Sequence, residues 1–332
     1  MGEYSGSRKD RRIVKTGSAR GTEDGKVARK TERIDHLRMY YVVYGLLYLM
    51  SLIPMRLLYL LADGLALFLY YIIRYRRPVV IGNLQIAFPE KTEAERRRIA
   101  KKFYRNFVDN FIETLKLLSA SHSYIKEHFI IDNPEILENF YHAGLRCQLH
   151  LGHTFNWEIA NAAFPLLSDY PFIVAYMPIE NRVFERLLLH LRRRTGTILL
   201  PATRLQRSIL PYRNTQYILT LVADQAPGNP DQSYWLNFFG RPTGFVRGPE
   251  RGARAGDIPA VFVRFYKTSR GHYRVYLTTI ADHPAQLPEG ELTRRYRELL
   301  EDAIRQDPDL WLWSHKRWKT PWKAEFSRLW ID

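Results

Sequence analysis

From residue 145 onward, short apolar runs typical of β-strands alternate with longer segments whose apolar residues recur at helical spacing. The strand-like runs are residues 145–151, 171–176, 197–200, 217–222, 260–266 and 273–280, and the helix-like runs are 156–167, 181–194, 204–212 and 290–305. This alternation predicts an α/β fold in which helices flank a mostly parallel sheet. The last two strands are joined across Ser269-Arg270-Gly271, which predicts a hairpin and therefore a mixed sheet.

An imidazole and a carboxylate lie five positions apart directly after the first strand-like run, in Gly152-His153-Thr154-Phe155-Asn156-Trp157-Glu158. On one regular helix these two side chains would point well apart. The spacing suits a strand that ends at His153, followed by a helix that Asn156 caps and that carries Glu158 in its first turn. Glu158 could then bend back to hold one imidazole nitrogen, leaving the other free to take a proton from a substrate hydroxyl.

Two neighbouring side chains have other possible roles. His150 lies three residues before His153, which is a spacing seen in metal sites, but a strand leading into a loop does not aim both rings at one point. No third ligand follows at a convincing spacing, so no metal is predicted. Cys147, the single cysteine, excludes an intrachain disulfide and is interpreted as a packed residue of the strand.

The first 78 residues differ in composition from the rest. Residues 1–37 are polar, basic and without periodicity, which predicts a flexible, solvated tail and not a signal peptide. Residues 39–55 carry no charge and would span about 26 Å as a helix, slightly short of a bilayer core of ~30 Å. A second apolar stretch, residues 57–73, is interrupted by Asp63-Gly64. We interpret residues 38–78 as a membrane-anchoring helix followed by an interfacial one, with a buried helical hairpin as the alternative.

The remaining residues, 79–332, are predicted to form the catalytic domain, which opens with an amphipathic helix over residues 91–118. Hydrophobic residues make up 46% of the chain, which excludes disorder of the whole. Lysine and arginine number 50 against 34 aspartate and glutamate residues, for a net charge of +16. Such a charge implies an acidic partner: nucleic acid, an anionic membrane surface or an acidic protein.

The run around His153 resembles the His-x4-Glu/Asp box of the lipid A biosynthesis acyltransferases, distant relatives of the glycerolipid acyltransferases. Further blocks resemble this family in the same order along residues 40–320. They are Arg76-Arg77 with Asn83-Leu84 and Ala87-Phe88-Pro89-Glu90, then Asn181 with Arg192-x-Arg194, then Ala223-Asp224-Gln225 with Phe238-Phe239-Gly240-Arg241-Pro242, and finally His315-Lys316-Arg317-Trp318-Lys319 at the end of residues 311–319. Each block alone is weak, and their order makes the match specific. The resemblance implies a glycerolipid-acyltransferase-like fold.

By this resemblance His153 is the general base and Glu158 the carboxylate that orients it. One of two arginines, Arg192 or Arg194, is expected to bind a phosphate or to stabilise the developing oxyanion, although cations near a helix C-terminus also interact favourably with the helix dipole. The residues expected to support the site are Asn156, Asp224, Gln225 and Arg241, with a cap or turn as the alternative for Asp224 and Gln225.

The chain departs from the family pattern at Arg247-Gly248-Pro249-Glu250-Arg251-Gly252, which is more charged than usual. These arginines either grip a differently phosphorylated headgroup or are simply exposed. The aromatic and cationic run at residues 311–319 is typical of single-strand nucleic-acid binders and of membrane interfaces. Beside an apolar N-terminal segment, the membrane interpretation is favoured.

The resemblance implies transfer of a fatty acyl chain from acyl carrier protein, or acyl-CoA, to a hydroxyl of an anionic glycolipid, a lipid A precursor. A thioester brings its own leaving group, so no cofactor is expected. The enzyme is expected at the bacterial inner membrane, with its active site on the cytoplasmic face. The alternatives are an O- or N-acyltransferase of the same fold that acts on another membrane lipid, and a non-enzymatic basic protein that binds membrane or nucleic acid. No nucleic-acid-binding motif of recognisable spacing is present, so nucleic acid is not an expected partner.

Overall fold

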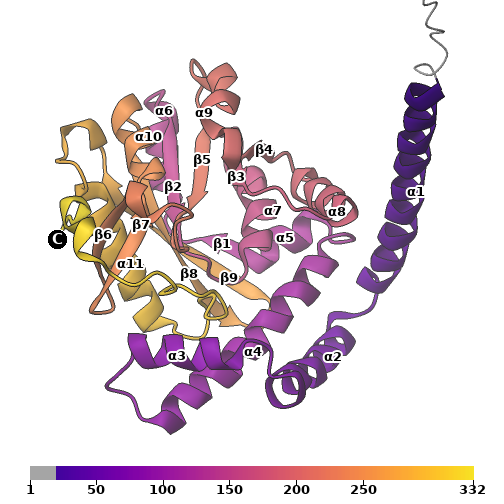
Figure 1. The fold of residues 1–332 in the computed structure, drawn as a ribbon, viewed down its shortest axis with the longest axis horizontal. Coiled ribbons are helices and arrows are strands. Elements are labelled where there is room, and N and C mark those ends of the chain that lie inside the picture. The colour runs from indigo at the N-terminus through magenta and orange to yellow at the C-terminus, as the bar shows by residue number, and fades with distance from the viewer. Residues whose placement is uncertain (1–19) are drawn as a thin grey trace, which may run out of the picture.

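The computed structural model describes residues 20–332, with side chains from residue 36 onward. Its centre is a mixed seven-stranded sheet in the order β1-β9-β8-β2-β5-β3-β4 (Figure 1). The strands are β1 (Phe129–Ile131), β2 (Cys147–Leu151), β3 (Phe172–Tyr176), β4 (Ile198–Pro201), β5 (Ile218–Val222), β8 (Ala260–Ser269) and β9 (His272–Ala281). Neighbouring strands are parallel except in the β8–β9 hairpin. The predicted α/β fold, with its final hairpin, is confirmed.

Helices cover both faces of this sheet. On the side where Cys147, Leu149 and Leu151 point, called the α7 face here, the core includes residues of α5, α6, α7 and α8. On the opposite side, called the α10 face, residues of α9, α10 and α11 pack. The α-helices after α2 are α3 (Arg77–Ala87), α4 (Glu93–Lys116), α5 (His122–His128), α6 (Glu135–His142), α7 (Trp157–Leu167), α8 (Arg182–Arg193), α9 (Leu205–Ser208), α10 (Gly248–Gly256) and α11 (Glu291–Gln306).

The long helices agree with the periodicity of the sequence. Four helices, α4, α7, α8 and α11, match the predicted segments to within a few residues. α4 begins at a capping box in which Thr92 accepts from the backbone of Glu95 and the Glu95 carboxylate accepts from the backbone of Thr92. The segment predicted as one helix over residues 204–212 is instead divided among η2 (Ala202–Arg204), α9 and η3 (Leu210–Tyr212), with Pro211 inside it.

Several short elements carry no clear periodic signal and were not expected. These are β1, α3, α5, α6, α10 and a separate hairpin of β6 (Ser233–Phe238) and β7 (Arg241–Val246). The remaining short helices are η4 (Pro230–Gln232), η5 (Pro284–Gln286) and η6 (Ala324–Leu329). α10 coincides with the basic run that departs from the family pattern. Its first turns contain two glycines and a proline, which are typical of a loop, so the sequence does not indicate a helix there.

The N-terminal segment differs from the prediction in its helix boundaries. α1 (Arg20–Ser51) begins inside the predicted tail, because residues 20–35 are rich in the good helix formers arginine, lysine, glutamate and alanine. Residues 1–19 of that tail lie outside the described residues. α1 ends at Ser51, three residues before Pro54, so the uncharged run over residues 39–55 does not form one helix. The predicted domain boundary at residues 78 and 79 falls inside α3.

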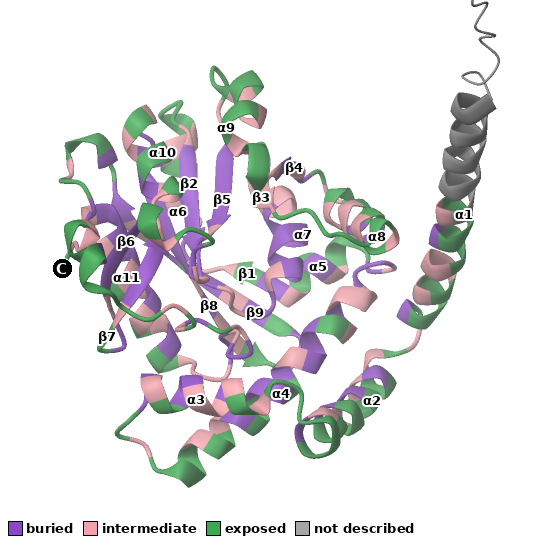
Figure 2. Cartoon of the chain, viewed as in Figure 1, coloured by how far each residue is buried: buried purple, intermediate pink, exposed green. Residues whose placement is uncertain are grey.

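Among the described residues, the one helix long and apolar enough to cross a membrane is Met55–Ile73, which comprises α2 (Met55–Phe68) and η1 (Leu69–Ile73). One side of α2 packs on α4 through Leu58, Ala62 and Ala66, all buried. Asp63 forms ion pairs with Arg105 and Arg270. The opposite side of α2 is exposed (Figure 2), so the helix is attached to the domain along its length.

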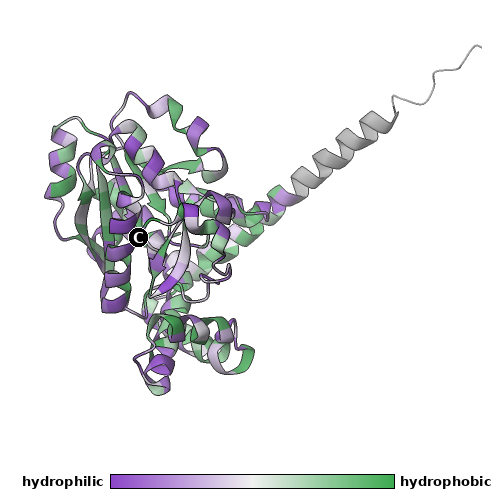
Figure 3. Cartoon of the chain, turned by 60° about the vertical axis from the view of Figure 1, so that its left-hand side comes forward, coloured by the Kyte–Doolittle hydropathy of each residue, from purple (hydrophilic) through white to green (hydrophobic). Residues whose placement is uncertain are grey.

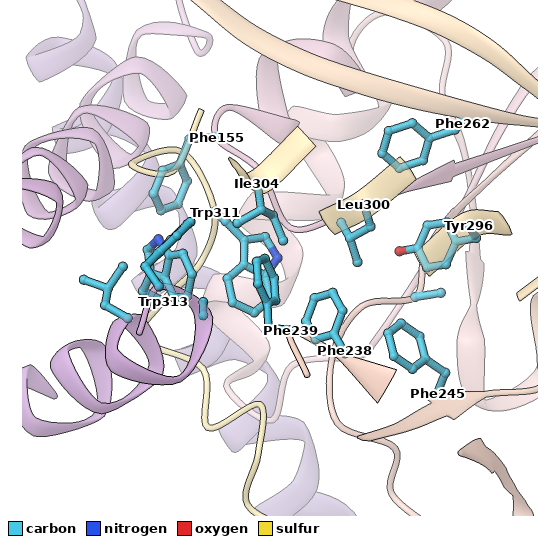
Figure 4. Packing of buried hydrophobic residues seen from close by; sticks show 14 of the residues in the cluster. Phe155, Phe238, Phe239, Phe245, Phe262, Tyr296, Leu300, Ile304, Trp311 and Trp313 are labelled. Carbon is cyan, nitrogen blue, oxygen red and sulfur yellow. The ribbon is translucent and has the colours of Figure 1, made fainter. Parts of the chain in front are cut away.

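The aromatic and cationic run at residues 311–319 is largely core, and its predicted membrane-interface role is wrong. Trp311, Trp313 and Arg317 are at most 2% exposed. The two indoles belong to one hydrophobic cluster with Phe155, Phe238 and Phe239, which also contains Leu300 and Ile304 of α11 (Figure 4). Arg317 donates to the backbone of Gly244 and lies over the rings of Phe238 and Phe245. A linear pattern of tryptophan and arginine does not distinguish a surface patch from a core in which aromatic rings pack against a guanidinium.

Candidate active site

His153 and Asp224 meet at the carboxyl ends of two neighbouring parallel strands. The register pairs Leu151 of β2 with Val222 of β5, and each strand is followed two residues later by one of these side chains. His153 Nδ1 lies 2.5 Å from Asp224 Oδ1, and the His153 backbone N–H donates to Asp224 Oδ2 at 2.8 Å. Active sites of α/β sheets gather at this edge because the loops there are free to carry function.

The Asp224 carboxylate is buried but satisfied. Its side chain is 1% exposed, and Oδ2 also accepts from Trp311 Nε1 at 2.6 Å. Burial acts to raise the pKa of Asp224, but the neighbouring imidazole and the hydrogen bonds from His153 and Trp311 outweigh it and hold this pKa below its ordinary value. An ionised carboxylate only accepts, so Nδ1 of His153 carries the proton and Nε2 presents a lone pair.

The loop that carries His153 is fixed on both sides. Its backbone pairs with the C-terminal run, since Leu312 N–H donates to His153 O and Phe155 N–H donates to Leu310 O, both at 3.0 Å. Gly152 is closely packed: a Cβ there would lie 2.6 Å from Leu300 Cδ1, so the buried Leu300 side chain would have to move to admit any other residue. Asn156 caps α7 as predicted, accepting from the backbone N–H groups of the second and third residues after it. Its amide also donates to Glu113 at 3.0 Å.

The structure does not place Glu158 against His153, and this predicted contact is wrong. Glu158 lies in the first turn of α7, as expected, but its carboxylate faces α8. It accepts three hydrogen bonds from Arg192, two from Nε at 2.9 and 3.2 Å and one from Nη2 at 2.5 Å. Trp157 Nε1 donates to the same carboxylate at 3.2 Å. The next strand in the sheet brings Asp224 within direct reach of the imidazole, whereas the first turn of α7 directs Glu158 toward α8.

The two candidate arginines have different surroundings. Arg192 lines the cleft that contains His153. Arg194 instead donates to the backbone carbonyls of Leu117 and Ala120, just beyond the C-terminus of α4. It therefore contributes to packing between helices. Of the two arginines, Arg192 is the one that lines the cleft, and its role in the site stays a prediction.

Two further predicted site residues, Gln225 and Arg241, differ in whether they line the cleft. Gln225 follows Asp224 and lines the cleft. Arg241 is exposed at the start of β7, at the turn of the hairpin, and is not among the cleft-lining residues. The unusual basic run at residues 247–252 does reach the cleft, because Arg247 and Arg251 line it. Arg251 is also exposed, so it lines the cleft and faces solvent at once, and binding of a phosphorylated headgroup stays a prediction.

The cleft has a volume of about 1970 Å³ and reaches both faces of the sheet beside β5. Because alternate strand residues point to opposite faces, its lining divides into residues of the α7 face and residues of the α10 face, here called its two arms, and His153 lines the same cleft at the strand ends. The α7-face arm is lined by Ala160, Phe164, Phe172, Val174, Thr220 and Val222. The α10-face arm is lined by Leu205, Ile209, Leu219, Leu221, Gly252 and Ala255. Its arginines are Arg192, Arg204, Arg207, Arg247 and Arg251, against the acids Glu158 and Asp231.

Other segments that carried the family resemblance surround the same site. Asn83 of α3 donates to the backbone carbonyls of Trp313 and His315, both at 2.8 Å. His315 in turn accepts from the Ala226 N–H at 3.1 Å, next to the loop that holds Asp224. Burial and the charge of Arg317 lower the pKa of His315 to about 4, so this ring is neutral at pH 7. The roles of Trp311 and His315 were missed, because their run was assigned to a membrane interface.

His150 and Cys147 are core residues of β2. His150 points to the α10 face and hydrogen-bonds Gln148 at 3.0 Å, whereas His153 contacts Asp224. Burial lowers the pKa of His150 to about 4. The Cys147 thiol is buried on the α7 face, as expected for a packed residue, and burial raises its pKa. Among residues 36–332 no three potential ligands gather into a metal-binding group.

Comparison with known proteins identifies the family of this chain. Residues 27–320 match the family described as bacterial lipid A biosynthesis acyltransferase. The chain is 22% identical over 294 residues to the lipid A biosynthesis palmitoleoyltransferase of Escherichia coli (strain K12), covering 86% of this chain and 93% of that protein. A lipid A biosynthesis acyltransferase of Shigella flexneri is similar to the same extent. Since the family match spans most of the chain, this protein belongs to the bacterial lipid A biosynthesis acyltransferases and is an acyltransferase.

Proposed function

We propose that the protein transfers a fatty acyl chain from an acyl thioester, carried by acyl carrier protein or by coenzyme A, to a hydroxyl of a lipid A precursor. The observation that carries this proposal is the His153–Asp224 pair, which leaves Nε2 of the imidazole as a base beside the cleft. Asp224 takes the orienting role that the sequence assigned to Glu158. A positioned general base typically contributes roughly 10²–10⁴ in rate.

The reaction needs one proton acceptor and one stabiliser of negative charge. Nε2 of His153 removes the proton from the acceptor hydroxyl, whose oxygen forms a bond to the thioester carbon. The carbon–sulfur bond then breaks, and the leaving thiolate recovers the proton from the imidazole. Arg192 is held by Glu158 through Nε and Nη2, and its Nη1 hydrogen-bonds no other described residue. We assign this guanidinium to the developing oxyanion or to a phosphate of the acceptor.

The lining of the cleft suits two substrates of mixed character. Its apolar arms accommodate acyl chains, because burial of each methylene contributes about 0.8 kcal/mol. Its arginines suit phosphate groups, which guanidinium binds through paired hydrogen bonds. Acyl transfer to a phosphorylated glycolipid uses both features.

The same chain offers a surface for the membrane. Exposed large apolar side chains are concentrated on α1 from residue 37 and on α2 and η1, where Leu57, Leu60, Leu61 and Ile72 are each more than half exposed. In Figure 3 the part of the α1 ribbon next to the body is coloured largely as hydrophobic. Because α2 is fastened to α4, we propose that it lies at the membrane interface instead of spanning the bilayer. The proposed location is the cytoplasmic face of the inner membrane.

Substitution of two exposed leucines tests this membrane surface. Leu60→Glu with Leu61→Glu is expected to lower partitioning onto anionic lipid vesicles at least tenfold, because the side chains are 70% and 63% exposed and each contributes roughly 1.5–3 kcal/mol when fully buried. Co-sedimentation with vesicles measures the effect. Leu145→Glu is the matched control, since Leu145 is 41% exposed and lies just before β2. Equal partitioning of both variants and wild type would place the membrane surface elsewhere.

The proposed reaction is tested with detergent-solubilised full-length protein. Acyl carrier protein and coenzyme A, each loaded with a range of chain lengths, are supplied together with a lipid A precursor, and product masses are measured. The expected product is the glycolipid with a mass gain of one acyl chain. Transfer to an amino-acid-derived lipid or to a glycolipid without phosphate, but not to the lipid A precursor, would replace the proposed acceptor.

A further inference from the structure

A second cationic surface lies outside the reaction centre, on the segment between β4 and β5. Residues 202–216, here called the α9 segment, contain Arg204, Arg207 and Arg213 but no aspartate or glutamate. All three arginines are exposed, and none forms an ion pair with another described residue. Exposed arginines in a segment without acidic residues create a positive electrostatic potential, which attracts an acidic partner.

α10 extends this cationic surface across the cleft. Arg251 is exposed and lines the cleft opposite the α9 segment. The one acid of α10, Glu250, is 1% exposed and is already engaged, because it accepts from the backbone of Gly290 and from the backbone and hydroxyl of Thr293. It therefore does not neutralise the surface.

The α10-face arm of the cleft runs between these two cationic walls. Leu219 and Leu221 of β5 form its floor, Leu205 and Ile209 line the side of the α9 segment, and the small residue Ala255 lines the side of α10. The arm leads along β5 toward the strand ends, where His153 lies. A narrow extended group that enters between the α9 segment and α10 would reach the base.

This surface is remote from the proposed membrane surface. Figure 1 shows α9 and α10 at the end of the molecule opposite α2. On the α9 segment Leu210 is the one large apolar side chain that is exposed, whereas α1, α2 and η1 expose many. A partner that binds here therefore approaches from the aqueous side while the lipid acceptor enters from the membrane.

We propose that the α9 segment and α10 form the docking surface for an acidic acyl carrier protein, whose phosphopantetheine arm lies in the α10-face arm and presents the thioester to His153. This inference rests on the proposed function and names its donor. Coenzyme A would also meet Arg204, Arg207 and Arg251, which line the cleft. Arg213 lies outside the cleft lining, so a protein is the donor that contacts it as well.

The test compares three donors that share one acyl chain: holo-acyl carrier protein, coenzyme A and pantetheine. The Arg213→Glu variant of the full-length enzyme, in which no cleft-lining residue is changed, is expected to raise KM for the carrier-bound thioester at least fivefold at low salt, against at most twofold for the pantetheine thioester. Added salt is expected to reduce the difference in KM for the carrier-bound thioester between wild type and variant, because salt screens the attraction between exposed charges. Arg328→Glu is the matched control, because Arg328 is exposed, lies in η6 and does not line the cleft.

Direct binding separates failure of this inference from failure of the proposed function. Immobilised wild type is expected to capture acyl carrier protein with at least fivefold higher affinity than the Arg213→Glu variant, whether or not transfer occurs. Transfer from coenzyme A and pantetheine with equal KM in both enzymes, and no difference in carrier binding, would overturn the docking surface and leave the acyltransfer proposal standing. Loss of binding to anionic vesicles, with carrier binding unchanged, would reassign the surface to the membrane.

Discussion

His153→Ala is expected to lower kcat for acyl transfer by roughly 10²–10⁴-fold, because the variant loses the nitrogen that takes the proton from the acceptor hydroxyl. The fold is expected to persist, since His153 is partly exposed and Asp224 keeps its hydrogen bonds from the backbone of residue 153 and from Trp311. Single-turnover transfer and thermal unfolding are the two measurements.

The matched control for His153→Ala is another histidine paired with an aspartate. His283 lies 3.0 Å from Asp257, and both side chains are exposed away from the cleft lining. His283→Ala should leave turnover within twofold of wild type. Near-normal turnover in His153→Ala would show that the proton leaves by another route and would remove the base from the proposed mechanism.

Asp224→Asn is expected to reduce kcat by a similar factor of roughly 10²–10⁴, because an amide no longer fixes the proton on Nδ1 and stabilises the imidazolium less. The substitution keeps the size of the side chain, so it separates the effect of charge from the effect of packing.

Glu158→Gln and Arg192→Lys should each lower kcat by a smaller factor than Asp224→Asn does. Combined, they should lose little more than either alone, since both substitutions break the same ion pair. If Glu158→Gln costs as much as Asp224→Asn and the two losses are not additive, Glu158 orients His153 during turnover.

Asp224→Asn is also expected to change how the free energy of unfolding depends on pH. The pKa of Asp224 is held below its ordinary value in the folded protein, so its ionised form stabilises the fold at pH values above about 3.9, the value for the unfolded chain. This contribution is lost as pH falls through the depressed pKa of the folded state. Urea unfolding should therefore show the difference in free energy between wild type and Asp224→Asn shrinking below about pH 4. A difference that is constant from pH 7 to pH 3 would mean that the charge of Asp224 contributes nothing.

Local pattern was sufficient for most of the scaffold. Six strand-like runs, the cap of α7 and the position of His153 at a strand end follow from residues within a few positions of one another. Short elements were not predicted for two reasons. A strand of three residues, such as β1, is too short to show a periodic pattern, and the glycine and proline residues of α10 are typical of a loop.

The sequence predicted only part of the candidate site, because strand order in the sheet decides which side chains lie close together. Asp224 is 71 residues from His153 along the chain, and the pairing of β5 with β2 brings them together. The nearer carboxylate, Glu158, is drawn to Arg192 by the packing of α7 on α8. Two positions further along the chain, Arg194 turns to the end of α4 instead of the cleft.

The amino-acid sequence alone therefore determined the α/β class, the place of His153 at a strand end and the family, since periodicity and ordered motifs are properties of the linear chain. Tertiary structure alone decided which carboxylate contacts the imidazole, which arginine lines the cleft and that the run at residues 311–319 is core. These are outcomes of long-range packing, in which burial and charge pairing select partners that no linear spacing specifies.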